Sequence, residues 1–145
     1  MDRRYPPRPW VGVGVIIVRD GRVLLVQRGR QPGRGLWALP GGMVDLGETM
    51  RQAAAREALE ETGLRVEVGD VYWVADGIVR DETGRVEYHN AIVDFLATAP
   101  DGEPAGADDA MDVRWVGPDD VEEMALTPSM WPLIEKLFGR SYRRA

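Results

Sequence analysis

The segment from Gly41 to Leu64, GGMVDLGETMRQAAAREALEETGL, constrains the fold more than any other part of the chain. Its glycine pair opens a loop, and either Glu48 or Thr49 caps the helix that follows. Gly63 suits the left-handed residue that commonly ends a helix. The segment therefore predicts a glycine-rich loop that leads directly into a helix.

Three carboxylates crowd one side of this helix. With about 100° between successive residues of a helix over residues 49–62, Glu57, Glu60 and Glu61 fall within one arc of about 100°. Acids three and four residues apart repel each other, and the helix dipole disfavours negative charge near the C-terminal end. The same arc holds small apolar side chains, which a solvated helix keeps apart from its acids. Several unfavourable local features in one place indicate a functional site.

A divalent cation would remove this conflict. Mg²⁺ prefers oxygen ligands and is commonly shared between a few carboxylates and substrate phosphates. The pair Gly41–Gly42 lets the backbone approach ions or phosphates closely. Arg56, together with Glu48 at the helix start, is placed to orient the carboxylates. The alternative is an ordinary helix of good helix formers, in which Arg56 and Glu60 make an i,i+4 pair.

Composition narrows the classes of protein and of metal site. The 145 residues fit one domain, residues 1–145, and no apolar run is long enough to cross a bilayer. The absence of cysteine excludes disulfides and thiolate metal sites and is compatible with a reducing cytoplasm. With a single histidine, His89, any metal should be a hard cation held by oxygen. The net charge of −6 argues against binding to a nucleic-acid polymer.

Strand patterns outnumber helical patterns along the chain. Residues 1–9 read as an extended N-terminal arm, packed on the body through Tyr5 or Trp10. Asp20–Gly21 predicts a hairpin turn, residues 99–110 read as a mobile acidic loop, and a short helix starts at Pro118. Strands are expected over residues 11–18, 22–27, 64–68, 71–75, 86–97 and 112–116, with a short apolar piece at 36–39 and a last helix over 129–138. This order favours an α/β fold with one mixed sheet between helices.

The spacing of the central segment resembles the Nudix box, GX5EX7REUXEEXGU, in which U is a bulky apolar residue. Gly42 is followed after five residues by Glu48, and Glu48 after seven residues by REALEETGL, residues 56–64. The fixed positions agree, and Ala58 is a small residue at the first U position. Residues 36–42, LWALPGG, and residues 113–116, VRWV, also resemble the flanks of such domains.

This resemblance implies a Nudix-type α/β/α sandwich around a mixed β-sheet. It also implies hydrolysis of a nucleoside diphosphate linked to another moiety, X, with one to three Mg²⁺ or Mn²⁺ ions. By position, the metal ligands would be Glu57, Glu60, Glu61 and the carbonyl of Gly42.

Two further roles follow from the resemblance. Arg56 and Glu48 would form the orienting pair beside the ligands. The general base is open between Glu60, Glu61 and an acid from a distant loop. Asp109 is the first loop candidate, and Asp108, Asp112 and Glu103 follow it.

Substrate contacts are less constrained by the sequence. Arg28, before the first glycine loop, is the best candidate for a phosphate. Gly41 offers its backbone, and Trp37 offers a stacking surface, although a core position is the alternative for Trp37. Other candidates for base, ribose or phosphate are Trp10, Trp73, Tyr88, His89, Arg34 and Arg80.

The identity of X stays open at this level. The proline that often follows the box in ADP-ribose pyrophosphatases is absent, and Tyr88 lies too far along the chain to match diadenosine polyphosphate hydrolases. We lean to ADP-ribose or a nucleotide sugar. The alternatives are a (d)NTP or oxidised-nucleotide pyrophosphatase that releases pyrophosphate, and a nucleotide-sensing domain without turnover. A homodimer is expected from family habit alone.

Overall fold

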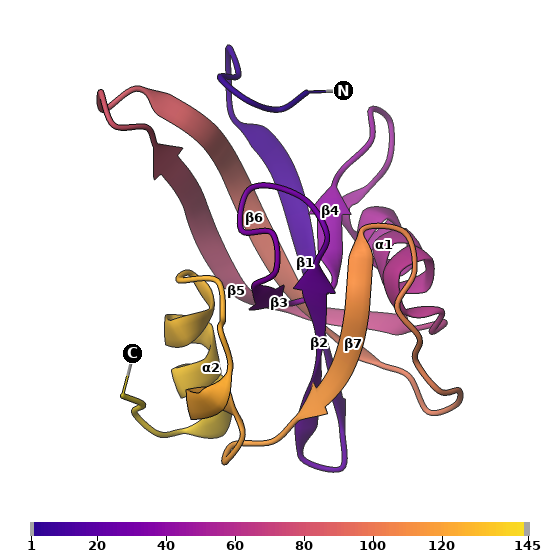
Figure 1. Cartoon of the computed structure of the whole chain (residues 1–145). Coiled ribbons are helices and arrows are strands. Elements are labelled where there is room, and N and C mark those ends of the chain that lie inside the picture. The colour runs from indigo at the N-terminus through magenta and orange to yellow at the C-terminus, as the bar shows by residue number, and fades with distance from the viewer. Residues whose placement is uncertain (1, 144–145) are drawn as a thin grey trace.

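The computed structural model describes residues 2–143 (Figure 1). Met1 of the predicted arm and residues 144–145 of the predicted domain lie outside the described residues. In chain order the elements are β1 (Trp10–Arg19), β2 (Arg22–Arg28), β3 (Trp37–Ala38), β4 (Gly41–Met43), α1 (Met50–Thr62), β5 (Glu67–Arg80), β6 (Val86–Thr98), β7 (Ala110–Val116), the 3-10 helix η1 (Val121–Glu123) and α2 (Met130–Phe138).

Among the described residues, strand β1 is the centre of a mixed, seven-stranded sheet with the order β3-β2-β1-β6-β5, and β4 and β7 lie off this path. Strand β1 runs parallel to β6, while β5 continues the sheet antiparallel to β6. On its other side, β1 pairs with β4 at residues 12–14 and with β2 only at residues 18–19. Strand β2 also pairs with β3 and β7. Because β4 and β2 meet β1 at different points, the sheet opens into two parts along β1.

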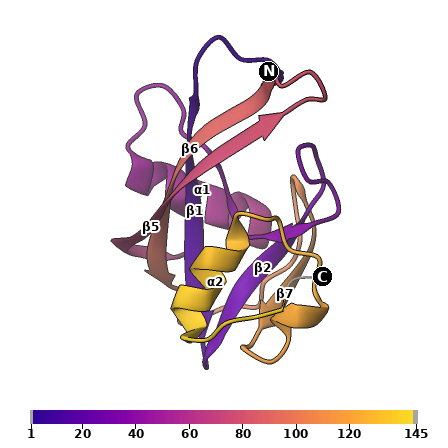
Figure 2. The same ribbon diagram turned by 90° about the vertical axis from the view of Figure 1, so that its left-hand side faces the viewer.

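The side chains of β1 alternate between two cores, as the period of a strand requires. Val13, Val15 and Ile17 pack with the alanines of α1 on one face. Ile16 faces the other way and packs with Leu133 of α2. Figure 2 shows α1 and α2 on opposite sides of β1. The predicted α/β/α arrangement around a mixed sheet is confirmed.

Most predicted elements are present, with shifts at their ends. The first hairpin turns at Asp20 and Gly21, whose φ angles of 52° and 74° are both positive, as such a two-residue turn needs. The prediction of two separate strands over residues 64–68 and 71–75 is wrong, because the structure does not divide these segments. They belong to the one strand β5, which begins at Glu67 and passes through register shifts between Val68 and Trp73.

Two further expectations are corrected. The glycine pair Gly41–Gly42 was expected in a loop, but it lies in β4 and pairs with Gly14 and Val13 of β1. An added Cβ at Gly41 would come within 2.2 Å of the Val13 carbonyl oxygen, so the close strand contact requires glycine. The helix expected from Pro118 is only the 3-10 turn η1, because the chain returns to extended backbone at Met124.

Helix α1 has the caps that its sequence predicts. Thr49 is the N-cap: its hydroxyl accepts from the Gln52 backbone N–H at 3.1 Å, and the Gln52 side chain accepts from the Thr49 N–H at 2.9 Å. Gly63 ends the helix in the left-handed conformation, with φ of 76°. Because Thr49 caps the helix, the carboxylate of Glu48 is available for another partner.

The N-terminal arm packs on the β5–β6 hairpin. The Tyr5 backbone N–H donates to the Glu87 carbonyl at 2.7 Å, and the Tyr5 hydroxyl donates to Asp81 at 2.7 Å. Arg4 adds an ion pair with Glu87 at 2.6 Å. Of the two residues expected to hold the arm, Tyr5 therefore makes the contact with the hairpin.

The acidic loop before β7 is attached to α1. The backbone N–H of Ala105 donates to Thr62 at 3.0 Å, and that of Ala107 donates to Glu61 at 3.2 Å. These bonds use carbonyls of the last turn of α1, which have no partner within the helix. The loop is thus held against the end of the helix that carries the acids, instead of being free of the body.

Within residues 2–143, no helix is long and apolar enough to cross a membrane.

Candidate active site

Arg56 is the centre of the predicted acidic site. Its guanidinium donates to both carboxylate oxygens of Glu48, at 2.8 and 2.9 Å, and to Glu57 at 2.7 Å. It also reaches Glu60 at 3.2 Å and the Met43 carbonyl at 3.0 Å. Only the planar, forked donor set of arginine can hold so many oxygens at once. Helix α1, the loop before it and β4 are therefore joined at one side chain.

The two glycines of β4 meet two of the acids. The Gly41 backbone N–H donates to Glu61 Oε1 at 2.8 Å. A Cβ at Gly42 would lie 2.5 Å from the Glu57 carboxyl carbon, so a side chain at Gly42 would occupy the space of that carboxylate. The backbone of β4 thus forms the wall opposite the acidic face of α1, as the sequence expectation for close backbone approach required.

Burial has unequal effects on the three carboxyl groups of α1. Glu61 is only 6% exposed, and burial is the main cause that raises its pKa to about 7. The charges of Glu57 and Asp109 raise this pKa further, while the Gly41 N–H and Arg28 lower it. Burial also raises the pKa of Glu57, against the hydrogen bond from Arg56. The Glu60 side chain is more open, at 43% exposure.

The pKa of Glu48 is shifted in the opposite direction, below its ordinary value. The hydrogen bonds from Arg56 are the main cause that lowers its pKa to about 2. In turn, Glu48 is the first cause of the raised pKa of Arg56. This pair therefore stays fully charged around neutral pH and holds the start of the site in place.

The loop acids divide into two groups. Asp108 and Asp109 lie near enough to α1 to act on it, since the charge of Asp108 raises the pKa of Glu57 and that of Asp109 raises the pKa of Glu61. Asp109 also pairs with Arg30 at 3.0 Å. Glu103 and Asp112 are exposed, as are Asp108 and Asp109, and Asp112 accepts from the Val113 N–H at 2.8 Å.

Arg28 and Trp37 lie on the β2–β3 side of the site. The Arg28 side chain donates to the Pro32 carbonyl at 2.7 Å, and burial lowers its pKa while Glu61 raises it. A half-buried guanidinium beside an acidic cluster is suited to an anionic phosphate group. Trp37 is half-buried and packs against the α2 core, so its core position agrees with the alternative reading of this residue.

The donor set fits a hard divalent cation in its chemistry. All candidate ligands are oxygens: the carboxylates of Glu57, Glu60 and Glu61 and the Gly42 carbonyl. Burial raises the pKa of both Glu57 and Glu61, so a cation bound beside them would stabilise their ionised forms. Within residues 2–143, however, no three acidic or imidazole side chains already converge as a metal-ligating group. In this arrangement Arg56 bonds to both Glu57 and Glu60.

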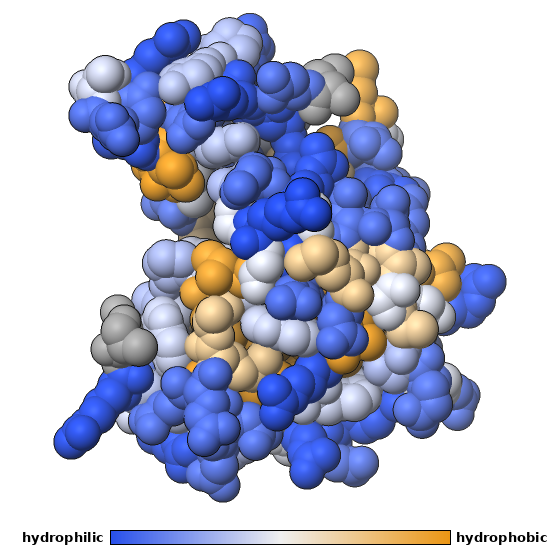
Figure 3. Space-filling model, viewed as in Figure 1, coloured by the Kyte–Doolittle hydropathy of each residue, from blue (hydrophilic) through white to orange (hydrophobic). Residues whose placement is uncertain are grey.

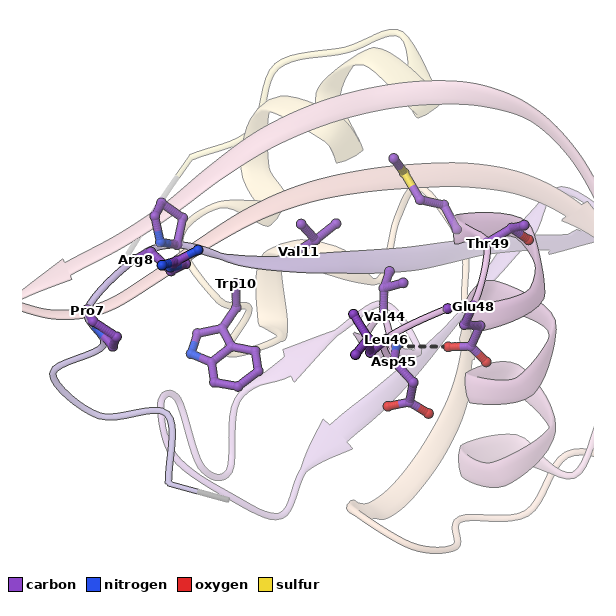
Figure 4. A pocket seen from close by; sticks show the side chains of 12 residues that line it. Pro7, Arg8, Trp10, Val11, Val44, Asp45, Leu46, Glu48 and Thr49 are labelled. Atoms are coloured by element: carbon purple, nitrogen blue, oxygen red, sulfur yellow. Dashed lines mark hydrogen bonds between the residues drawn. The ribbon is translucent and has the colours of Figure 1, made fainter.

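A hollow of about 690 Å³ borders the site on the side of the N-terminal arm (Figure 4). Residues 7–11 line one side, and residues 44–50 line the other. In Figure 4, the Trp10 ring and the Asp45 carboxylate lie on the same side of β1, and the Asp45 N–H donates to Glu48 at 3.0 Å. The hollow thus adjoins the Arg56–Glu48 pair and has one aromatic side.

One buried carboxyl group escaped the sequence interpretation. Asp94 of β6 is 5% exposed and lies against Gly14 of β1. It stands in a valine- and leucine-rich strand, VDFL, where an acid is out of place. That contrast was the available signal, since burial itself is not visible in a sequence.

The metal-free protein should lose stability as the pH rises. Glu61 has a usual pKa of 4.5 and a pKa of about 7 in the fold, so the folded state binds the proton more tightly than the unfolded chain between these values. Stability therefore falls through this window, by on the order of 3 kcal/mol from Glu61. Urea unfolding with a chelator at about pH 5 and about pH 8 measures the difference.

The variant Glu61→Gln isolates this contribution. Glu57 and Asp94 also have raised pKa values and act in the same direction, so part of the slope should persist in the variant. A wild-type protein whose unfolding free energy stays level or rises between the two pH values would contradict the assignment.

Comparisons with known proteins bear on the fold and on the class of protein. A family model described as NUDIX domain matches residues 8–137. An ADP-ribose pyrophosphatase of Methanocaldococcus jannaschii is 36% identical over 117 residues, which cover 81% of this chain and 67% of the relative. An oxidized purine nucleoside triphosphate hydrolase of Danio rerio is 39% identical over 121 residues, 81% of this chain and 69% of the relative.

A solved structure shares the fold as well. The MutT NUDIX hydrolase from Burkholderia pseudomallei is 36% identical, with a TM-score of 0.77 that covers 88% of this chain and 97% of that one. The two named relatives act on different nucleotides, so the matches agree on the class of protein and differ on the substrate.

Proposed function

This chain belongs to the Nudix hydrolase family, and from this premise we propose that it cleaves the diphosphate of a nucleoside diphosphate linked to another moiety. ADP-ribose or a nucleotide sugar is the preferred substrate class, in agreement with the name of one relative. The observation that carries the proposal is the Arg56 network, which holds Glu48, Glu57 and Glu60 in one cluster beside β4.

The proposed cofactor is Mg²⁺ or Mn²⁺, as one to three ions. Glu57, Glu60, Glu61 and the Gly42 carbonyl would hold it, and it would supply charge neutralisation and an activated water. Arg56 and Glu48 keep the ligands oriented, because Arg56 bonds to the ligand side chains and Glu48 fixes Arg56.

The residues around the acids would bind the substrate and accept a proton. Arg28 lies beside Glu61 and would pair with a phosphate oxygen, while Gly41, whose N–H meets Glu61, would offer its backbone to the diphosphate. Because Glu60 and Glu61 would be committed to the cation, we assign proton acceptance to Asp109, whose charge acts on Glu61 from the loop.

Two alternatives to this substrate class and activity differ in their support. A (d)NTP or oxidised-nucleotide pyrophosphatase is favoured by the name of the other relative. A sensing domain without turnover would not need to keep the full set of acids, so the complete cluster argues against it.

We further propose that residues 1–145 form one domain that acts in the cytoplasm on small nucleotides, and not on nucleic-acid polymers or membranes. The homodimer remains a prediction, which light scattering after size exclusion would check.

A substrate panel tests the proposed function. The protein is incubated with Mg²⁺ and ADP-ribose, nucleotide sugars, dinucleotides, NTPs or 8-oxo-dGTP, and the products are separated by chromatography. ADP-ribose should give AMP and ribose 5-phosphate, whereas a nucleoside triphosphate substrate should give the monophosphate and pyrophosphate. Glu61→Gln, prepared in the same way, controls for contaminating hydrolases. Tight nucleotide binding without turnover of any compound would overturn the enzyme in favour of the sensor.

A further inference from the structure

Asp94 is a buried carboxylate without a protein partner. It is 5% exposed, and no hydrogen bond or ion pair to its side chain is present among residues 2–143. Burial alone raises its pKa to about 6, with no charged neighbour involved. The only fully enclosed, unpaired polar side-chain atom in the described residues is Nε of Arg19, so the Asp94 oxygens keep a small contact with solvent. A carboxylate in this condition is costly for the fold unless it meets a ligand.

The position of Asp94 connects it with the candidate active site. Across the sheet, the register aligns Gly41 of β4, Gly14 of β1, Asp94 of β6 and Trp73 of β5 in one row. Gly41 is the residue whose N–H binds Glu61. Two strand spacings separate Gly41 from Asp94, about 10 Å in total. That distance is comparable with the span of a nucleoside monophosphate from its phosphate to its base.

The two glycines keep this row free of side chains. A Cβ at Gly14 would lie 2.1 Å from Oδ1 of Asp94 and 3.2 Å from Leu39, so the carboxylate lies across β1 on the face of Leu39. Gly14 and Ile16 are two residues apart, so this is the α2 face of the sheet, opposite α1, and the two faces would be joined around β4, which pairs with β1 alone. The Asp94 carboxylate thus extends from β6 across β1 in the direction of β4, past Gly14, which has no side chain.

The surroundings of Asp94 are apolar and aromatic. Trp37, Leu39 and Trp73 are half-buried on this face. In the space-filling view, the surface is indented between the β5–β6 hairpin and the part of the body that carries α2, with hydrophobic residues on both sides of the indentation (Figure 3). A flat, apolar group with a polar edge suits such a place, because its faces pack on the side chains and its edge meets the acid.

We propose that Asp94 is the specificity residue for the base, and that it accepts a hydrogen bond from the exocyclic amino group of adenine. The proposal rests on the proposed function, in which the diphosphate binds at Gly41 and the acids of α1. An ionised carboxylate is an acceptor only, so it binds an amino group and repels the carbonyl oxygen that hypoxanthine presents at the same position. Cytosine and uracil form a second pair with the same difference, as amino and carbonyl bases.

The test compares bases that differ in this one group. Binding of AMP and of IMP is measured by quenching of tryptophan fluorescence without divalent cations, at about pH 8, where Asp94 is ionised. The wild-type protein should prefer AMP by about 10- to 100-fold, the size of a hydrogen bond to a charged group. CMP should be preferred to UMP in the same direction. Because no turnover is needed, the result is independent of the reaction.

Two substitutions should remove the preference by different routes. Asp94→Asn gains an amide donor that can meet a carbonyl oxygen, so IMP should bind more tightly and the ratio should fall below about threefold. Asp94→Ala has no acceptor, so AMP should bind less tightly and the ratio should fall as well. Asp76→Asn, an exposed acid on the neighbouring strand β5, is the matched control and should keep the wild-type ratio.

The outcomes separate the inference from the proposed function. Equal affinity of the wild type for AMP and IMP, or an unchanged ratio in both Asp94 variants, would overturn the role of Asp94. If the protein hydrolyses no compound of the panel but keeps an Asp94-dependent preference for AMP, the proposed enzymatic function is wrong and the role of Asp94 in binding the base is supported. Thermal unfolding of each variant checks the fold, and Asp94→Asn should be at least as stable as the wild type, because a buried charge is removed.

Discussion

Replacing Glu61 with glutamine should lower kcat by about 10²- to 10⁴-fold and make the metal-free protein more stable. Glu61 is buried, and the charges of Glu57 and Asp109 oppose its ionisation. Glutamine removes the charge but keeps a carbonyl oxygen for the Gly41 N–H, which is 2.8 Å away. The free energy of unfolding should therefore rise by about 1–3 kcal/mol. Steady-state kinetics and urea unfolding with a chelator measure the two effects.

Glu60→Gln is the informative comparison for this result. Glu60 belongs to the same cluster, but 43% of its side chain is exposed. Its variant should lose activity to a similar degree, while its stability should change by less than about 0.5 kcal/mol. Glu82→Gln, at the exposed turn after β5, should leave both quantities unchanged. Full activity in both Glu60→Gln and Glu61→Gln would show that these acids do not hold the cofactor.

Removing the side chain of Arg56 should weaken both the site and the fold. Arg56→Ala leaves Glu48, Glu57 and Glu60 without the donor that they share. We expect a 10- to 100-fold loss of activity at fixed Mg²⁺, the usual effect of removing a group that orients metal ligands. The free energy of unfolding should fall by about 1–3 kcal/mol, since the network is only partly buried.

Arg56→Lys tests whether charge or shape carries this effect. Lysine keeps the positive charge but has a single ammonium group that cannot hold two carboxylates and the Met43 carbonyl in a plane. It should therefore restore stability in part and activity only slightly. Arg51→Ala, on the same helix but outside the acidic cluster, is the control for activity. If Arg56→Lys had wild-type activity, the forked geometry would not matter, and the orienting role would be wrong.

The helix and its acids were open to prediction because they depend on local chemistry. Thr49, Gln52 and Gly63 cap α1 through contacts within a few residues, and the 3.6-residue period fixes which side chains share a face. The hydrogen bonds between Arg56 and Glu48 also join residues only eight positions apart, across the start of the same helix. Each of these features is close in sequence, so spacing alone was sufficient.

Other features depend on which strands become neighbours. In the sequence, the glycine pair of β4 resembles a loop, and only its pairing with β1 makes it a strand. The two strand patterns after α1 resemble two strands, and only their pairing with β6 makes them one. The loop acids Asp108 and Asp109 come near α1 because backbone bonds attach that loop to Thr62. These contacts join segments far apart in the chain, and no periodicity within one segment reports them.

The sequence by itself determined the α/β class, the acidic helix and the family, because caps, periodicity and exact spacing are local properties. The tertiary structure decided how deeply those residues are buried and which charged groups lie near them. It buried Glu61 more than Glu60, placed Arg28 beside Glu61, and aligned Asp94 with Gly14 and Gly41 across three strands. Burial and charge proximity depend on distances in space, and these distances arise only when the sheet has paired.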